Sequence, residues 1–163
     1  MFQGDLFDKT ETVKKNFLDQ LNRHEVVMCP CCGRNARIWK LRIHATLALM
    51  LIRLYKKSLE LNGAPDQWVH IEAFKPKTRT GNDFSIVKHW GLAEPKSPEV
   101  DQDKNSSGMW RLTDAGRLWV SRQATIKKYA NVFNDVLRSY DGEDITVIDA
   151  LGKTFSYYEL FNQ

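Results

Sequence analysis

The chain has no cysteine outside one short cluster, because its three cysteines all lie between Cys29 and Cys32. Cysteines so close in sequence cannot staple distant loops, which excludes the disulfide framework of small secreted domains. A long apolar run is also missing. The longest one, Ala45 to Ile52, is much shorter than the roughly 20 residues that span a bilayer. We therefore expect a protein without a membrane segment.

The motifs of common enzyme classes are missing as well. The sequence has no glycine-rich phosphate loop, no His-Glu-x-x-His and no Gly-x-Ser-x-Gly. No signature of a nucleophilic cysteine accompanies the cysteine cluster. The first residues carry Asp5, Asp8 and Glu11 and no apolar core, which is not the pattern of a secretory signal. We expect a protein that is not an enzyme and that resides in the cytoplasm.

Acidic residues are absent from Val26 to Leu59, although the net charge of the whole chain is only +4. The basic residues in that segment are Arg34, Arg37, Lys40, Arg42, Arg53, Lys56 and Lys57. A second basic group follows at Lys75, Lys77 and Arg79, whereas acidic residues outnumber basic ones after Tyr129. This distribution predicts an electrically polarised molecule with a basic side suited to a polyanion.

Hydrophobic periodicity predicts a mixed α and β protein. Helices are expected over residues 10–23, 44–61 and 115–123, and the second of these is apolar around most of its circumference, as in a central helix. Short strands are expected at 26–28, 36–43, 68–71 and 109–112. Apolar residues on both sides of Asp141-Gly142, up to Val147 and Ile148, predict a β-hairpin that turns there. A short helix over 155–161 is expected to close the chain.

Residues 82–90 are expected to form a further short helix, which we call the candidate recognition helix. Its apolar residues Phe84, Val87 and Trp90 are three apart and should be buried, and Gly91 is the expected C-cap. After a strand that ends at Pro95 and a polar loop over 96–108, the segment Gly108–Gly116 should form a strand that leads into a helix. Its Thr-Asp-Ala-Gly sequence supplies an N-cap, Thr113, and a glycine, Gly116, that allows close passage.

The predicted order over residues 44–123 is helix, short strand, short helix or loop, helix, strand, polar loop, strand, helix. This order resembles that of winged helix-turn-helix proteins, and so do the local sequences Val87–Leu92 and Gly108–Gly116. The resemblance implies an α+β fold with a winged-helix domain over 44–124. An N-terminal helix and cysteine knuckle (1–43) and a C-terminal β-hairpin with a short helix (125–163) would flank it.

The whole chain is also similar to small uncharacterised proteins of tailed bacteriophages. The similarity lies in the Cys-Pro-Cys-Cys-Gly turn, the basic strand and long helix after it, the Trp-Gly-Leu turn and the segment Asp149–Gly152. It implies a phage origin, and therefore the cytoplasm of the host cell, but it implies no activity.

The recognition helix of a DNA-binding winged helix enters the major groove. The resemblance therefore implies duplex DNA as the partner, with contacts from Lys75, Lys77, Arg79, Asn82, Ser85, Lys88 and His89 to phosphates and base edges. Asp83 and the acidic residues of the 96–108 loop count against DNA, and winged helices also bind proteins. We expect a regulatory DNA-binding protein. The alternative is a phage effector that binds and modulates a host protein, and a homodimer is left open.

The turn Cys29–Gly33 matches the Cys-Pro-x-Cys-Gly knuckle of zinc ribbons, in which the two outer sulfurs bind one zinc ion. A structural zinc ion needs four ligands, and a second cysteine pair is missing here. His24, His44 or a partner chain would have to complete the shell around Cys29 and Cys32. The alternative is a knuckle-shaped turn whose thiols are simply buried. The expected cofactor is therefore either none, which the missing half of the site favours, or one structural zinc ion.

Overall fold

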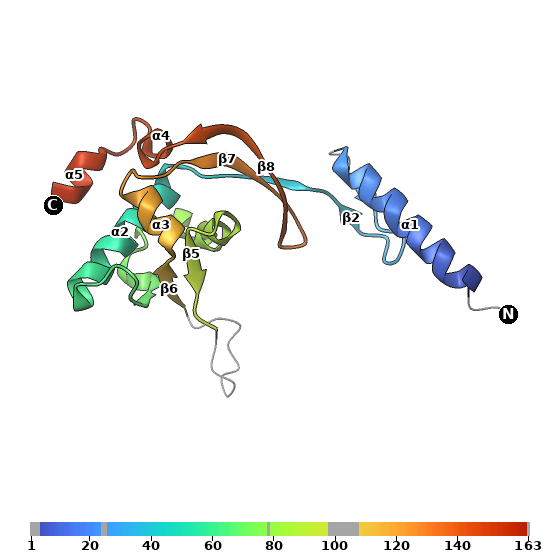
Figure 1. The fold of residues 1–163 in the computed structure, drawn as a ribbon, viewed down its shortest axis with the longest axis horizontal. Coiled ribbons are helices and arrows are strands. Elements are labelled where there is room, and N and C mark those ends of the chain that lie inside the picture. Colours follow the sequence, from blue (N-terminus) through green and yellow to red (C-terminus); the bar gives the residue numbers. More distant parts are fainter. Residues whose placement is uncertain (1–3, 24–25, 78, 98–107, 163) are drawn as a thin grey trace.

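The computed structural model describes residues 4–23, 26–77, 79–97 and 108–162, and the side chains of all of these except 4–8, 62 and 79–82. The protein is of the α+β class, with antiparallel pairing in its small sheets. Figure 1 shows a body built around α2, from which an arm made by β3, β7 and β8 extends towards α1. Among the described residues, no helix combines the length and apolarity needed to cross a membrane.

The outer end of the arm holds α1 (Gly4–Asn22) and a small hairpin of β1 (Val27–Met28) and β2 (Asn35–Ala36). The helix begins earlier than the predicted residue 10. Only one end of its apolar stripe is covered, because Leu21 is buried and Phe17 packs on Phe133 with ring centroids 6.2 Å apart, whereas Val13 is 49% exposed. The helix is therefore anchored through its last turns.

The central helix α2 (Ala45–Asn62) has nearly the predicted bounds. It begins after His44, whose backbone is extended, and ends at Gly63, whose φ of 69° allows its N–H to donate to the Leu59 carbonyl. The prediction of a central helix is confirmed by its fully buried side chains, which include Leu47, Met50, Leu51, Ile52 and Leu54. Full burial of such a side chain stabilises the fold by about 1.5–3 kcal/mol, so this helix organises the core.

One three-stranded sheet packs against α2 and has the order β4-β6-β5. Its strands are β4 (Val69–His70), β5 (Ala93–Pro95) and β6 (Met109–Leu112). Two 3-10 helices, η1 (Ile71–Ala73) and η2 (Arg79–Trp90), connect β4 to β5, and α3 (Asp114–Val120) follows β6. In α3, Trp119 is fully buried, whereas its neighbour Leu118 is 44% exposed.

The second three-stranded sheet has the order β3-β7-β8 and forms the arm. It joins β3 (Trp39–Arg42), from the predicted strand 36–43, to β7 (Ile126–Phe133) and β8 (Val136–Ile145). The predicted turn at Asp141-Gly142 is wrong, because the hairpin turns at Asn134-Asp135. Both turn residues have positive φ, 50° and 60°, as a two-residue hairpin turn with right-handed twist requires.

Asp141-Gly142 lies inside β8, at an irregularity in the pairing where Lys127 is opposite Asp144 and Tyr129 is opposite Asp141. Gly142 has a φ of 82°, and a Cβ there would come within 2.7 Å of the Tyr129 ring. The dipeptide therefore serves a β-bulge, which uses the same left-handed backbone preference as a turn.

The chain closes with two short helices on the body, α4 (Val147–Leu151) and α5 (Tyr157–Asn162). The second strand of the hairpin, β8, therefore ends at Ile145. The prediction that this strand reaches Val147 and Ile148 is wrong, because both residues lie in α4. A capping box explains the change, since the Thr146 hydroxyl accepts from the Asp149 N–H while the Asp149 carboxylate accepts from the Thr146 N–H. The predicted C-terminal helix is present as α5.

Candidate nucleic-acid interface

The candidate recognition helix is η2, and its apolar side is buried as predicted. A 3-10 helix has three residues per turn, so Phe84, Val87 and Trp90 lie in one row. They are at most 6% exposed. The Phe84 ring makes edge contacts with Phe74 and with Trp110, each at 5.1 Å between centroids. This packing fixes which side of η2 can face a partner.

The exit from η2 is fixed by the two sequence segments that suggested a winged helix. Gly91 has a φ of 65° and turns the chain into β5. Thr113 caps α3 by accepting a hydrogen bond from the Gly116 N–H (3.1 Å), and its own N–H donates to the Leu92 carbonyl (3.2 Å). A Cβ on Gly116 would overlap that carbonyl oxygen, so the predicted need for glycine at this close approach is confirmed.

The last turn of η2 is covered by the turn between β7 and β8. The Lys88 Nζ lies 2.5 Å from an Asp135 carboxylate oxygen, and the His89 Nε2 lies 3.3 Å from the other oxygen. The Tyr140 hydroxyl donates to the His89 carbonyl at 2.7 Å. His89 was expected on the exposed face, but its side chain is only 7% exposed, so that expectation is wrong. The cause is the hairpin, whose turn falls at Asp135 and not at Asp141.

Burial also changes the ionisation of this contact. It lowers the pKa of the His89 imidazole, an effect that the nearby Asp135 carboxylate opposes. The hydrogen bond from Lys88 lowers the pKa of Asp135. At neutral pH we therefore expect a neutral His89 beside an ion pair of Lys88 and Asp135.

The remaining predicted DNA contacts lie at the start of η2 and before it. Ser85 is exposed on η2, and Lys77 is exposed before it, whereas Lys75 forms an ion pair with Glu72 at 2.6 Å. The predicted contacts of the Arg79 and Asn82 side chains fall outside the described residues, as do residues 98–107 of the predicted polar loop over 96–108.

Arg42 of β3 extends this surface and was not among the predicted contacts. The Arg42 side chain is exposed. Burial is the main cause that lowers the pKa of His44, and the nearby charge of Arg42 lowers it further. Asp83 of η2 opposes this shift, so Arg42 and Asp83 both lie near His44. The run of basic residues in the sequence was the available signal, but only the fold places one of them beside η2.

The acidic residues after Tyr129 do not form a separate acidic side. Four of them pair with lysines of other segments: Asp135 with Lys88, Asp141 with Lys40, Glu143 with Lys128 and Asp144 with Lys127. The charge separation predicted from the sequence is therefore smaller than expected.

The cysteine turn has the backbone geometry of a knuckle. The Cys29 N–H donates to the Arg34 carbonyl (2.8 Å), and the Gly33 N–H, at a φ of 69°, donates to the Cys29 carbonyl (2.9 Å). Hydrogen bonds from the N–H groups of Cys31 and Cys32 are the main causes that lower the pKa of the Cys29 thiol. The expectation of buried thiols is wrong, because Cys29 is only half-buried and Cys31 and Cys32 are exposed.

A complete metal site is not assembled within the described part of the chain, where no three His, Cys, Asp or Glu side chains converge. His44 caps α2 in the body, whereas the turn lies with β1 and β2 at the outer end of the arm. The structure therefore does not bring the predicted ligand His44 to the turn. The other predicted ligand, His24, lies outside the described residues.

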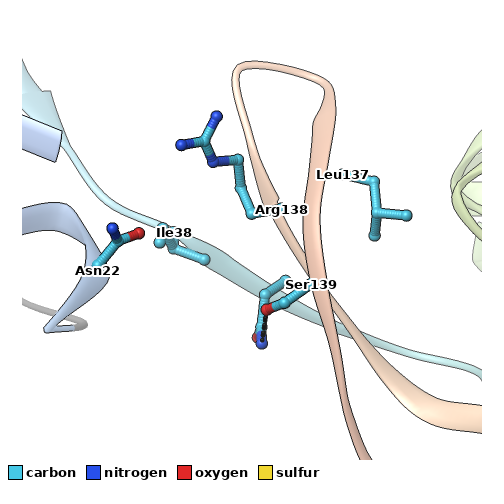
Figure 2. Close-up of a pocket in the computed structure, with 6 residues that line it drawn as sticks. Asn22, Ile38, Leu137, Arg138 and Ser139 are labelled. Carbon is cyan, nitrogen blue, oxygen red and sulfur yellow. Dashed lines mark hydrogen bonds between the residues drawn. The ribbon is translucent and has the colours of Figure 1, made fainter.

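A separate cavity of about 350 Å³ lies between the end of α1 and the arm (Figure 2). Its walls include Asn22 and Ile38, and the Arg138 side chain extends towards α1. Asn131 is 5% exposed and donates to the Ser139 hydroxyl at 3.0 Å, while its carbonyl oxygen has no partner in the described structure. These groups can hold a polar ligand. The described walls of the cavity contain no carboxylate or imidazole for acid–base chemistry.

Comparisons of the chain with protein-family models, with curated proteins and with solved structures gave no significant match.

Proposed function

We propose that the protein binds duplex DNA through the polar face of η2, in a regulatory role, and that the segment from α2 to α3 is a winged-helix module. The order of its elements and the strand order β4-β6-β5 support the module. The resemblance of Val87–Leu92 and Gly108–Gly116 to winged-helix sequences supports it independently.

One observation carries the DNA proposal: η2 turns Phe84, Val87 and Trp90 inward and leaves Ser85 and Lys88 on its outer side. A helix with this division can enter a groove without losing its packing. Two further cations add to this face, Lys77 before η2 and Arg42 beside it. Neither forms an ion pair with any of the described residues.

The ion pair between Lys88 and Asp135 fits this proposal. Its carboxylate is 69% exposed, so the pair is worth no more than about 1 kcal/mol. A DNA phosphate can replace such a carboxylate, because Lys88 then exchanges one anion for another. According to this proposal, the β7–β8 turn covers Lys88 until DNA binds.

The direct test is fluorescence anisotropy of a labelled random duplex with the wild-type protein and with the triple variant Arg42→Ala/Lys77→Ala/Lys88→Ala. We expect the triple variant to lose at least about tenfold in affinity, or 1.4 kcal/mol. A control that removes the same charge elsewhere is Lys57→Ala/Lys127→Ala/Lys153→Ala. Equal losses in both variants would show only a general charge effect and would refute the assignment of η2.

Binding of a host protein is a second candidate function. It is favoured by Val26, Met28 and Trp39, which are 58%, 67% and 54% exposed at the outer end of the arm. Large apolar side chains that gather on a surface are typical of protein interfaces. Capture of one host protein by the wild type and by the triple variant, but not by Met28→Ser/Trp39→Ser, would favour this function over DNA binding.

A further inference from the structure

The cysteine turn presents two thiols on one surface. Cys29 and Cys32 line the same hollow, of about 770 Å³, at the outer end of the arm. The turn is held by the hairpin of β1 and β2 and by the hydrogen bonds of Gly33 and Cys29 described above. Two cysteines separated by two intervening residues on such a turn provide half of the tetrahedral sulfur shell that zinc prefers, with Zn–S distances of about 2.3 Å.

The other half of the shell is not supplied by the described part of the chain. The two thiols are nevertheless accessible, because Cys32 is exposed and Cys29 is only half-buried. A zinc ion held here by two sulfurs alone would keep open positions that face away from the protein. A ligand pair brought by another molecule can reach those positions without rearrangement of the fold.

The surroundings of the thiols fit a second copy of the same turn. Arg34 and Arg37 line the hollow with the cysteines, and a zinc ion with four thiolates carries a net charge of −2 that such arginines balance. Val26 and Met28, which flank the turn on its β1 side, are exposed. A two-fold axis through the metal brings identical surfaces together, so each copy would cover the apolar side chains of the other.

We propose that one zinc ion joins two copies of this chain, bound by Cys29 and Cys32 from each copy. The reaction takes Zn²⁺ and four thiols to a tetrathiolate complex and releases four protons, without any change of oxidation state. Cys31, between the two ligands, takes no part. The partner is a second copy of the chain, and the proposal is independent of the DNA-binding function.

The test uses the full chain, purified free of metal under a reductant that does not bind zinc. Sedimentation velocity during a titration with zinc chloride should show a monomer that becomes a dimer, with an end point of about one zinc ion per two chains. EDTA should restore the monomer. Cys29→Ser and Cys32→Ser should each abolish both zinc binding and dimerisation, whereas the matched control Cys31→Ser should retain both.

Three results would overturn the proposal. One zinc ion per monomer, lost in His24→Ala, would place the missing ligands within the chain. A dimer that persists in EDTA would show association without metal. Absence of zinc binding by the wild-type chain would leave the turn without a metal role. The EDTA experiment needs no substitution, so it decides the question even if a cysteine variant fails to fold.

Discussion

The Thr113 hydroxyl donates a hydrogen bond to the Gly91 carbonyl and so ties the cap of α3 to the exit of η2. The two residues are 22 positions apart in the sequence. The same hydroxyl accepts from the Gly116 N–H. One side chain therefore sets both the start of α3 and the direction in which η2 leaves the core.

Replacement of Thr113 by Val keeps the shape of the side chain and removes the hydroxyl. We expect the free energy of unfolding to fall by about 1–2 kcal/mol, because a helix cap and a hydrogen bond are each worth roughly 1 kcal/mol. Urea unfolding measures the change. Thr113→Ser retains both bonds and should lose less than half as much; equal losses would contradict the role given to the hydroxyl.

Replacement of Gly116 by Ala places a methyl group on the Leu92 carbonyl oxygen. Overpacking of this kind costs about 1–3 kcal/mol or more, so we expect a clear loss of stability in urea, although alanine is the better helix former. Ala115→Ser, at the exposed neighbouring position, should change stability by no more than about 0.5 kcal/mol. A Gly116→Ala variant as stable as the wild type would mean that α3 does not pass so close to β5.

The sequence predicts best where local and tertiary preferences agree. The helix over α2 follows from its apolar periodicity and from Gly63, and the burial of Phe84, Val87 and Trp90 follows from their spacing. The predicted position of the hairpin turn is wrong because the chain has two dipeptides that tolerate positive φ, Asn134-Asp135 and Asp141-Gly142. Local preference cannot decide between a turn and a bulge, since the choice depends on pairing across the arm.

The candidate site is harder to predict than the fold for the same reason. The exposure of His89 depends on Asp135, 46 residues later, which reaches it only because the hairpin turns there. Trp39 lies in β3, within the predicted strand 36–43, and is exposed because β3 runs beyond the body along the arm. The error at His89 comes from a contact between distant segments.

The depressed pKa of His89 predicts loss of stability in acid. The unfolded chain takes up a proton near pH 6.5, whereas burial keeps the folded imidazole neutral to lower pH. The stabilising contribution is therefore complete above about pH 6.5 and is lost as pH falls towards the folded pKa. His44 shifts in the same direction.

Urea unfolding at about pH 8 and about pH 5.5 tests this effect, because the range spans the unfolded pKa of histidine. His89→Gln should lose less stability over the range than the wild type, since it lacks the contribution of His89 and retains that of His44. The ionisable groups around His89, which are Lys88, Asp135 and Tyr140, are present in both proteins. An unaltered pH dependence would show that His89 does not stay neutral in the folded protein.

Removal of the Asp135 charge should favour DNA. Asp135→Asn keeps a residue that suits positive φ, releases Lys88 and removes a carboxylate that would face phosphates. We expect duplex binding that is about threefold to tenfold tighter, with a stability change of at most about 1 kcal/mol. Asp144→Asn removes the same charge from the pair with Lys127 and is the control. A similar gain in both variants would count against a specific cover over η2.

The salt dependence of duplex binding tests the central proposal most directly. For each phosphate contact, the slope of log affinity against log salt concentration changes by about 0.9. The account predicts that Arg42→Ala/Lys77→Ala/Lys88→Ala makes the slope shallower by about 2.7, and that the control Lys57→Ala/Lys127→Ala/Lys153→Ala leaves it close to that of the wild type. A triple variant with the wild-type slope, or a wild-type protein without measurable duplex binding at low salt, would contradict it.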